Sequence, residues 1–458
     1  MTTHRSPPPR ARRSASVKRP LREDLVTQTC LEVYAAVRHE GRLADRVLEH
    51  ILRERKHLYS LERRTIAERV YTLLRRQRLV DFVADRAVRG FATLATSQKD
   101  LWRLAIVRRL EGEDASAIVE ALSLSGPDAK LLKGLEVHLE ALADLPPLQH
   151  LAIEASLPDF LARRLLDELG DEAREAAAAM NVRGPLTVRT NTLKITRELL
   201  QQRLEQENVV VRPTPLSPFG LFLETRVNVY SLAAFKEGLF EVQDEGSQLL
   251  GMLVDAPPRK VVDACAGAGG KSLQLAAQMK NKGDLFALDV ESRRLEDLKL
   301  RARRAGVHNI RVQRIEPGPE ALEQLQALQQ GCERVLVDAP CSGTGTFRRK
   351  PDARYRLEEK SLAEHVVRQK TLLERFSTLV KPGGRLIYGT CSILTEENED
   401  VIQDFLGRHP EFALAPAEKW LGPELGPKVT RDGMLRLHTH RHGTDGFFGA
   451  VLVRRAAG

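Results

Sequence analysis

The chain of 458 residues has only five cysteines, and their spacing excludes several classes of protein. No two of them form a Cys-x-x-Cys pair and their number is odd, which argues against a disulfide framework and against a structural zinc site. Free thiols require a reducing compartment, so we expect a cytoplasmic protein. The five are Cys30, Cys265, Cys332, Cys341 and Cys391.

Long apolar runs are also missing. None approaches the ~20 residues that a membrane-spanning helix needs. The N-terminus carries Arg and Pro in place of the apolar stretch of a secretory signal. We therefore expect no membrane partner, and we expect a monomer.

Negative charge is in deficit. The chain has 71 Lys and Arg but 62 Asp and Glu, so its formal net charge is +9. This positive charge favours a polyanionic partner such as RNA or DNA. The basic residues gather in the N-terminal tail, between Arg53 and Arg89, and in the loop Arg348-Arg349-Lys350. The helix expected over residues 61–79 has an arginine-rich face that we interpret as a candidate RNA contact, although charged helix faces are usually only solvated. That face carries Arg63, Arg64, Arg69, Arg75, Arg76 and Arg78.

Four segments differ in composition. Residues 1–22, with seven Lys or Arg among Pro and Ser, predict a disordered basic arm. Residues 23–148 show helical spacing throughout and predict an all-helical RNA-binding domain. Residues 149–258 predict a small α+β RNA-binding segment. Residues 259–458 alternate strands and helices, which indicates an α/β fold with a doubly wound, Rossmann-like and mostly parallel sheet. Its strands are expected at 260–263, 285–289, 310–314, 334–338, 385–389 and 447–453.

A glycine-rich turn, Cys265-Ala-Gly-Ala-Gly-Gly-Lys271, follows the first of these strands. Read as a phosphate-binding loop, it has Cys265 where a glycine is required; read as a dinucleotide fingerprint, it has Ser272 in place of the third glycine. The third reading is a site for S-adenosylmethionine. This reading needs an acid at the end of the second strand, which Asp289 supplies and which could accept both ribose hydroxyls. Asp289 could equally cap the helix expected near Glu291.

Cys341 and Cys391 each follow an apolar strand and precede a serine. Since the carboxyl ends of parallel strands meet at one edge of a sheet, we expect both thiols beside the glycine turn. A lone cysteine in such a place is most often a small buried hydrophobe, and we interpret Cys30, Cys265 and Cys332 in that way, with Cys265 also expected close to the cofactor. A thiolate added to carbon 6 of a pyrimidine activates carbon 5 for methylation, and a second group assists release. Asp338 could bind the exocyclic amine or ring nitrogen 3 of cytosine.

These segments resemble the dual-cysteine RNA (cytosine-5) methyltransferases. The resemblance covers roughly residues 150–455, and the helical part before it looks like an anti-termination-factor-type RNA-binding domain. Relatives that pair the two act on a cytosine of 16S rRNA. The runs that carry the resemblance are Asp263–Lys271, Asp338–Gly343, Thr390–Ser392, Arg348–Asp352, Glu396–Asn398, Asp445–Phe448, Val188–Asn191 and Gln243–Gln248.

The resemblance implies a role for each site residue. Cys391 would be the nucleophile, Cys341 would assist product release, and Asp338 would activate the cytosine. Glu316 stands where the family tends to place an Asp after the third strand, and Gly267-Ala268 stands where it usually has Ala-Pro. S-adenosylmethionine would contact Cys265, Ala266, Gly267, Ala268, Gly269, Gly270, Lys271, Asp289, Glu316 and Asp338.

The basic loop and a histidine cluster complete the candidate sites. Arg348, Arg349 and Lys350 follow Cys341 closely and are predicted to hold the phosphates that flank the target base. The run His438-Thr-His-Arg-His442 would place three histidines on one face of a strand. No cysteine or carboxylate is spaced to complete a tetrahedral site, so we expect no metal.

Three other functions stay open. A tRNA cytosine-5 methyltransferase would share the catalytic core. A catalytically idle ribosome assembly factor would need only the basic helical domain. A phosphate-binding-loop NTPase would need the glycine that Cys265 replaces.

Overall fold

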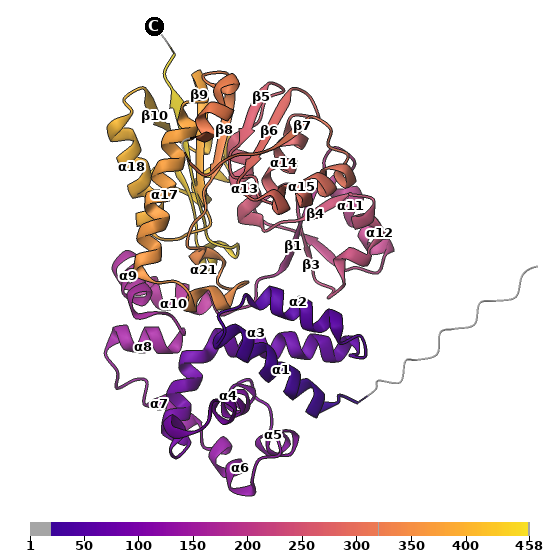
Figure 1. The fold of residues 1–458 in the computed structure, drawn as a ribbon, viewed down its shortest axis with the longest axis vertical. Coiled ribbons are helices and arrows are strands. Elements are labelled where there is room, and N and C mark those ends of the chain that lie inside the picture. The colour runs from indigo at the N-terminus through magenta and orange to yellow at the C-terminus, as the bar shows by residue number, and fades with distance from the viewer. Residues whose placement is uncertain (1–19, 319, 457–458) are drawn as a thin grey trace, which may run out of the picture. The chain divides into compact units, whose positions relative to one another are not determined.

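The computed structural model describes residues 20–318 and 320–456, so the predicted basic arm falls almost wholly outside the described residues. The chain divides into two compact units (Figure 1). Met1–Leu74 with Val83–Leu139 form the first, and Arg75–Phe82 with Glu140–Gly458 form the second. The division into four domains stays a prediction.

The first unit is helical. Apolar side chains recur every three or four residues in its helices and point inward, as the helical spacing of residues 23–148 predicted; Val26, Cys30 and Val33, for example, are buried in α1. Its helices are α1 (Glu23–Arg38), α2 (Ala44–Glu54), α4 (Thr96–Leu110), α5 (Ala115–Ala121), α6 (Gly126–Lys133), most of α7 (Glu136–Glu140) and most of α3 (Ser60–Ala87).

The arginine-rich face of α3 does not form a free basic surface. Arg69 donates two hydrogen bonds to Glu23, at 2.7 and 3.0 Å. Arg63 donates to backbone carbonyls at the end of α2, and Arg64 pairs with Glu68 one turn on. Arg63 and Arg69 tie α3 to neighbouring helices, and Arg64 pairs within α3, so these three side chains do not support the RNA contact that we read from the single sign of this face, which stays a prediction.

The second unit begins with three helices and a small antiparallel sheet, whose strand order is β2-β3-β1-β4. Two further helices pack on this sheet around Val188, Leu204 and Phe240. The elements are α8 (Pro147–Glu154), α9 (Asp159–Leu169), α10 (Ala173–Ala179), β1 (Leu186–Thr190), α11 (Arg197–Gln206), β2 (Val211–Pro213), β3 (Gly220–Leu223), α12 (Ala233–Lys236) and β4 (Phe240–Val242).

A nine-stranded sheet fills the rest of the second unit, in the order β11-β12-β13-β9-β8-β5-β6-β7, with β10 paired to β13. The strands from β9 to β7 are parallel, as the alternating sequence predicted, and β13 runs antiparallel to β9. The predicted strands correspond to β5 (Lys260–Asp263), β6 (Asp284–Asp289), β7 (Ile310–Arg314), β8 (Cys332–Asp338), β9 (Val380–Thr390) and β13 (Phe447–Arg454).

Helices cover both faces of this sheet (Figure 1). Neighbouring strand residues point to opposite faces, so Val261 packs with one layer and Val262 with the other. This arrangement confirms the doubly wound α/β prediction. One layer holds α13 (Glu245–Val254), α14 (Gly270–Gln278) and α15 (Ser292–Ala305); the other holds α17 (Glu359–Ser377) and α18 (Glu399–Arg408).

The sequence prediction missed strands at the antiparallel edge. They are β10 (Phe412–Ala415), β11 (Thr430–Arg431) and β12 (Met434–Leu437). Each has four residues or fewer, too few to show a clear alternation of apolar and polar side chains. Every helix among the described residues is too short or too polar to cross a lipid bilayer.

Candidate active site

The two cysteines at the strand ends meet. Cys341 follows β8 and Cys391 follows β9, and their Sγ atoms lie 3.3 Å apart. A disulfide needs about 2.05 Å, so these are two free thiols in contact. The adjacency of β8 and β9 in the sheet brings them together, as their positions at the strand ends predicted.

Direct hydrogen bonds join the loops that carry the thiols. The amide of Gly345 donates to the carbonyl of Cys391 at 3.0 Å. The hydroxyl of Thr344 accepts from the amide of Ile393 and contacts the hydroxyl of Ser392, both at 3.1 Å. The spacing of the two sulfur atoms is therefore fixed by the loops and not only by the strands.

The contact between the sulfur atoms changes the acidity of one of them. The pKa of Cys341 lies well above the ordinary value of a thiol, because Cys341 is hydrogen-bonded to Cys391 and is buried. Cys341 therefore holds its proton at neutral pH and offers it to Cys391.

Lys271 and Asp338 form an ion pair beside the thiols. Their Nζ and Oδ2 atoms lie 2.7 Å apart. Burial lowers the pKa of Lys271, but the Asp338 carboxylate more than offsets this effect, so the pKa of Lys271 lies above its usual value. Both residues were candidates from the sequence, but their pairing was not predicted, because they are 67 positions apart: Lys271 lies at the start of α14, and Asp338 ends β8.

The glycine turn needs its glycines for two different reasons. Gly269 has φ of +87°, and a Cβ there would come within 2.6 Å of the side chain of Leu298. Gly267 has φ of +53°, and a Cβ there would meet nothing within 4 Å, so this side of the turn is open. The first glycine position therefore faces a space that a ligand could enter.

Asp289 has one of the two roles weighed from the sequence, the cap of α15, and its contact with the ribose stays a prediction. Its Oδ1 accepts from the amide of Glu291 at 2.9 Å, which braces the start of α15. Its Oδ2 accepts from the amide of Gly267 at 2.8 Å, which ties the acid to the glycine turn. A carboxylate oxygen has a further lone pair, so both contacts leave capacity for a ribose hydroxyl.

Two arginines that the sequence did not mark as site residues hold the same turn. Arg189 of β1 donates to the carbonyl of Gly270 at 2.8 Å, and Arg301 of α15 donates to that of Ala268 at 2.7 Å. Burial lowers the pKa of Arg189 to about 9, so it stays charged at neutral pH. Its place in the Val188–Asn191 run was the only signal in the sequence.

The residues around the turn fit S-adenosylmethionine. Burial raises the pKa of Asp263 to about 7, and one of its buried oxygens, Oδ1, has no hydrogen-bond partner among the described residues. An orphaned buried carboxylate oxygen is costly unless a ligand supplies a donor, and the ammonium group of the cofactor's amino acid is one. Cys265 also lies in this turn; burial raises its pKa well above the ordinary value, so it stays protonated.

Glu316 has a partner outside the turn. It follows β7, and its carboxylate pairs with Arg314 at 3.0 Å and is 40% exposed. Its contact with the cofactor stays a prediction.

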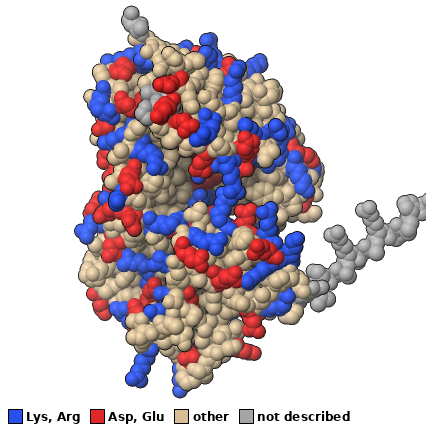
Figure 2. Space-filling view, in the orientation of Figure 1, with Lys and Arg blue, Asp and Glu red and all other residues tan. Residues whose placement is uncertain are grey.

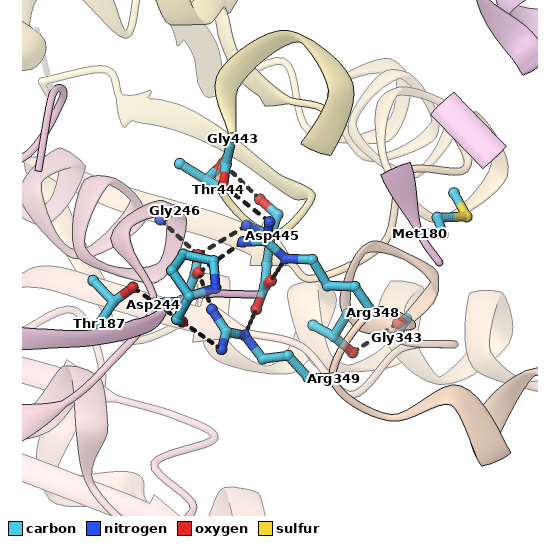
Figure 3. A network of polar contacts seen from close by, with 12 residues as sticks. Met180, Thr187, Asp244, Gly246, Gly343, Arg348, Arg349, Gly443, Thr444 and Asp445 are labelled. Carbon is cyan, nitrogen blue, oxygen red and sulfur yellow. Dashed lines mark hydrogen bonds and ion pairs between the residues drawn. The ribbon is translucent and has the colours of Figure 1, made fainter. Parts of the chain in front are cut away.

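Arg348 and Arg349 have a different task from the predicted one. Both guanidinium groups point at the carboxylates of Asp244 and Asp445 in a buried network (Figure 3). Arg348 is only 5% exposed. Phosphate binding would have to displace these pairs, which makes the two arginines poor candidates for RNA contacts. Lys350 is exposed and stays a candidate.

The histidine cluster is not on a strand, contrary to our expectation. His438 precedes the short helix α21 (Thr439–His442), and burial lowers its pKa to about 3. His440 pairs with Glu172 at 3.0 Å. Nowhere in residues 20–318 and 320–456 do three His, Cys, Asp or Glu side chains gather as possible metal ligands.

Three features together define an S-adenosylmethionine-dependent methyltransferase. They are the glycine turn, the acid at the end of the second strand and the doubly wound sheet. Comparisons with known proteins narrow this class. The family described as 16S rRNA methyltransferase RsmB/F matches residues 252–453, and the ferredoxin-like domain of RsmF/B-like methyltransferases matches residues 157–230. The chain belongs to this family of rRNA methyltransferases, which confirms the family expected from the motifs.

Relatives cover most of the chain. A probable ribosomal RNA small subunit methyltransferase B from Synechocystis is 30% identical over 418 residues, 86% of this chain and 91% of the relative. One of the same description from Bacillus subtilis is 35% identical over 307 residues, 66% of this chain and 67% of the relative. The solved structure of PH0851 has a TM-score of 0.75 at 29% identity, covering 93% of this chain and 98% of that one.

Proposed function

We propose that this protein methylates carbon 5 of a cytosine in 16S rRNA through a covalent adduct with Cys391. The observation that carries the proposal is the 3.3 Å contact between the sulfur atoms of Cys391 and Cys341 beside the Lys271–Asp338 pair. A methyltransferase that attacked a ring nitrogen or a hydroxyl would need no thiol at this position, because such atoms are nucleophiles without activation.

The first step is addition to the ring. The Sγ of Cys391 forms a bond to carbon 6, and the electrons of the double bond between carbons 5 and 6 move into the ring. Asp338 accepts a hydrogen bond from the exocyclic amine and so orients the base, and the ion pair with Lys271 holds the Asp338 carboxylate in place. S-adenosylmethionine supplies the methyl group that carbon 5 then takes.

The second step releases the product, and the coupled thiols explain how. While Cys391 is a thiolate, its contact keeps the proton on Cys341. Adduct formation removes the charge on Cys391 and with it the main cause of the raised pKa of Cys341. Cys341 can then lose its proton to solvent water, and its thiolate takes the proton on carbon 5. The electron pair restores the ring double bond, and the bond from carbon 6 to Cys391 breaks.

The family supports a proposal for the RNA substrate, and we also propose a cell compartment and an oligomeric state. We propose 16S rRNA because the relatives are described as small-subunit enzymes. The visible face carries Lys and Arg interspersed with Asp and Glu (Figure 2), and the exposed Lys350, which follows the two paired arginines, is the RNA contact that we propose. We place the enzyme in the cytoplasm, as a monomer. A tRNA substrate is the alternative that the shared core permits.

The test uses methyl-labelled cofactor and two unmodified RNAs, 16S rRNA and tRNA. We expect transfer to carbon 5 of a cytosine of 16S rRNA alone. Cys391→Ala should abolish transfer, and Cys341→Ala should accumulate a protein–RNA adduct that survives denaturation. Cys30→Ala, at a buried thiol in the first unit, is the matched control and should turn over normally. Normal turnover by Cys341→Ala would refute the assigned roles.

A further inference from the structure

Each of the two thiols is bracketed by the residues on either side of it. Before Cys341, the carbonyl of Pro340 accepts from Gln369 Nε2 at 3.0 Å. After it, the amide of Ser342 donates to Glu397 Oε1 at 2.8 Å. Gln369 also donates to the same Glu397 oxygen at 2.9 Å, which closes the bracket.

An equivalent bracket surrounds Cys391. Before it, the hydroxyl of Thr390 donates to Asn398 Oδ1 at 2.6 Å. After it, the carbonyl of Ser392 accepts from Asn398 Nδ2 at 3.0 Å. Adjacent residues, Glu397 and Asn398, therefore hold the two cysteine loops, although the cysteines themselves are 50 positions apart.

The bracket is buried and anchored to the sheet. Gln369, Glu397 and Asn398 are each 0% exposed. Tyr388 of β9 donates its hydroxyl proton to the carbonyl of Glu397 at 2.6 Å, which fixes this segment against the strand that immediately precedes Cys391. A buried carboxylate is costly unless donors surround it; Glu397 has the amide and the hydroxyl of Ser342 and the amide group of Gln369.

Core packing alone does not require such a set of polar groups, because apolar side chains of similar volume would fill the space without the cost of desolvation. What the polar groups add is direction, since three of the hydrogen bonds hold a backbone group next to a cysteine, those of Pro340, Ser342 and Ser392. The two brackets meet in one dipeptide, so a displacement of either loop would strain the other.

We propose that Glu397 and Asn398 are positioning residues that hold the sulfur atoms of Cys341 and Cys391 in register. Glu397, with Gln369, sets Cys341 for release, and Asn398 sets Cys391 for addition. The assignment of separate steps depends on the proposed function; the fixed distance between the thiols does not.

The distance can be tested without RNA. Diamide oxidises two neighbouring thiols to a disulfide and is itself reduced to the hydrazine. The rate of the Cys341–Cys391 disulfide, followed by peptide mass spectrometry, reports how well the sulfur atoms are aligned. We expect Glu397→Leu and Asn398→Leu to form it about 10- to 100-fold more slowly than the native enzyme, as a misplacement of about 1 Å would predict.

Matched controls lie at the opposite end of the same sheet. Glu333 near the start of β8 pairs with Lys381, and Asn309 precedes β7 and donates to the carbonyl of Lys282. Glu333→Leu and Asn309→Leu should form the disulfide at the native rate. Glu397→Gln keeps one acceptor oxygen for Ser342 and should restore most of the rate. If Glu397→Leu does not fold, Gln369→Leu replaces it, with a smaller loss expected.

The amount of covalent protein–RNA adduct then distinguishes the role of Glu397 from that of Asn398. Glu397→Leu should accumulate the protein–RNA adduct with both cysteines present, since release is impaired. Asn398→Leu should lower the amount of adduct in the Cys341→Ala background, since addition is impaired. A general loss of stability would lower both.

The outcomes distinguish two failures. Folded Glu397→Leu and Asn398→Leu variants that form the disulfide at the native rate, or a native enzyme that forms none, would overturn the positioning role. A slow disulfide in both variants, with no adduct from Cys341→Ala, would support the positioning role and refute the covalent mechanism.

Discussion

The two ends of the large sheet carry polar residues of different kinds. At the carboxyl ends of β5, β8 and β9, the polar groups are in close contact: Asp263 is buried, and Asp338 and the two thiols are half-buried. At the amino ends, pairs such as Arg311–Asp284 lie largely in solvent, at 65% and 38% exposure. The sheet therefore ends in a polar cluster at one edge, and its opposite edge carries ordinary surface pairs such as the one between β6 and β7.

This difference shows at which edge of the sheet the polar groups have the larger effect on the free energy of folding. Buried polar and charged groups destabilise unless each has a partner, whereas exposed pairs contribute little either way. Substitutions at the carboxyl ends should therefore change activity or stability strongly, and equivalent substitutions at the amino ends should not.

The largest effect is expected on catalysis. Asp338→Asn should lower the rate of methyl transfer about 10²- to 10⁴-fold, the range for removal of a group that acts on the reacting base. Glu333→Gln, five residues earlier on the same strand, should leave the rate unchanged. Single-turnover kinetics with 16S rRNA measure both, and equal rates for the two variants would erase the contrast between the ends.

A large loss of stability is expected from the buried network that holds the loop after Cys341. Arg348→Met leaves Asp244 and Asp445 without one of their partners in a buried site. Breaking such a pair costs about 3–5 kcal/mol. Urea denaturation should show this fall in the free energy of unfolding, and a loss below about 1 kcal/mol would show that the network is only a surface feature.

The coupling of the thiols should be visible in their chemistry. Cys391→Ala removes the main cause of the raised pKa of Cys341. The thiolate fraction of Cys341 at a given pH should then rise about tenfold for each unit that its pKa falls. Alkylation of Cys341 by iodoacetamide should accelerate accordingly, measured by mass spectrometry. An unchanged rate would mean that the two sulfur atoms do not interact.

A pH-dependent effect is expected at Asp263. Its pKa is about 7 in the folded protein and about 4 when unfolded. Between these values the folded state holds a proton that the unfolded chain has lost, so this group reduces stability as pH rises through that window. Asp263→Asn should therefore make Tm fall less between pH 5 and pH 7.5. A parallel shift of Tm at all pH values would contradict the raised pKa.

The smallest effect should come from the amino ends. Arg311→Met breaks the exposed pair with Asp284, and about 0–1 kcal/mol is the usual worth of such a pair. Urea denaturation of Arg311→Met and Arg348→Met under the same conditions compares the two losses in the free energy of unfolding. A loss as large as that of Arg348→Met would remove the distinction between the two ends.

The sequence by itself determined the fold class, the parallel strands and the residues of the catalytic edge. Apolar strands of four to eleven residues followed by Gly, Asp or Cys are local patterns, and the rule that ligands bind at the carboxyl ends of strands turns them into a site. The motifs around Cys341, Cys391 and the glycine turn also identified the family correctly.

Only the tertiary structure decided which polar groups are paired. Arg348 and Arg349 looked like phosphate contacts because charge is visible in a sequence, whereas their partners Asp244 and Asp445 are about one hundred positions away. The Lys271–Asp338 pair, the arginines that hold the turn and the brackets around the thiols likewise join segments far apart in the chain. Such contacts depend on strand order and on burial, which a local pattern of residues does not encode.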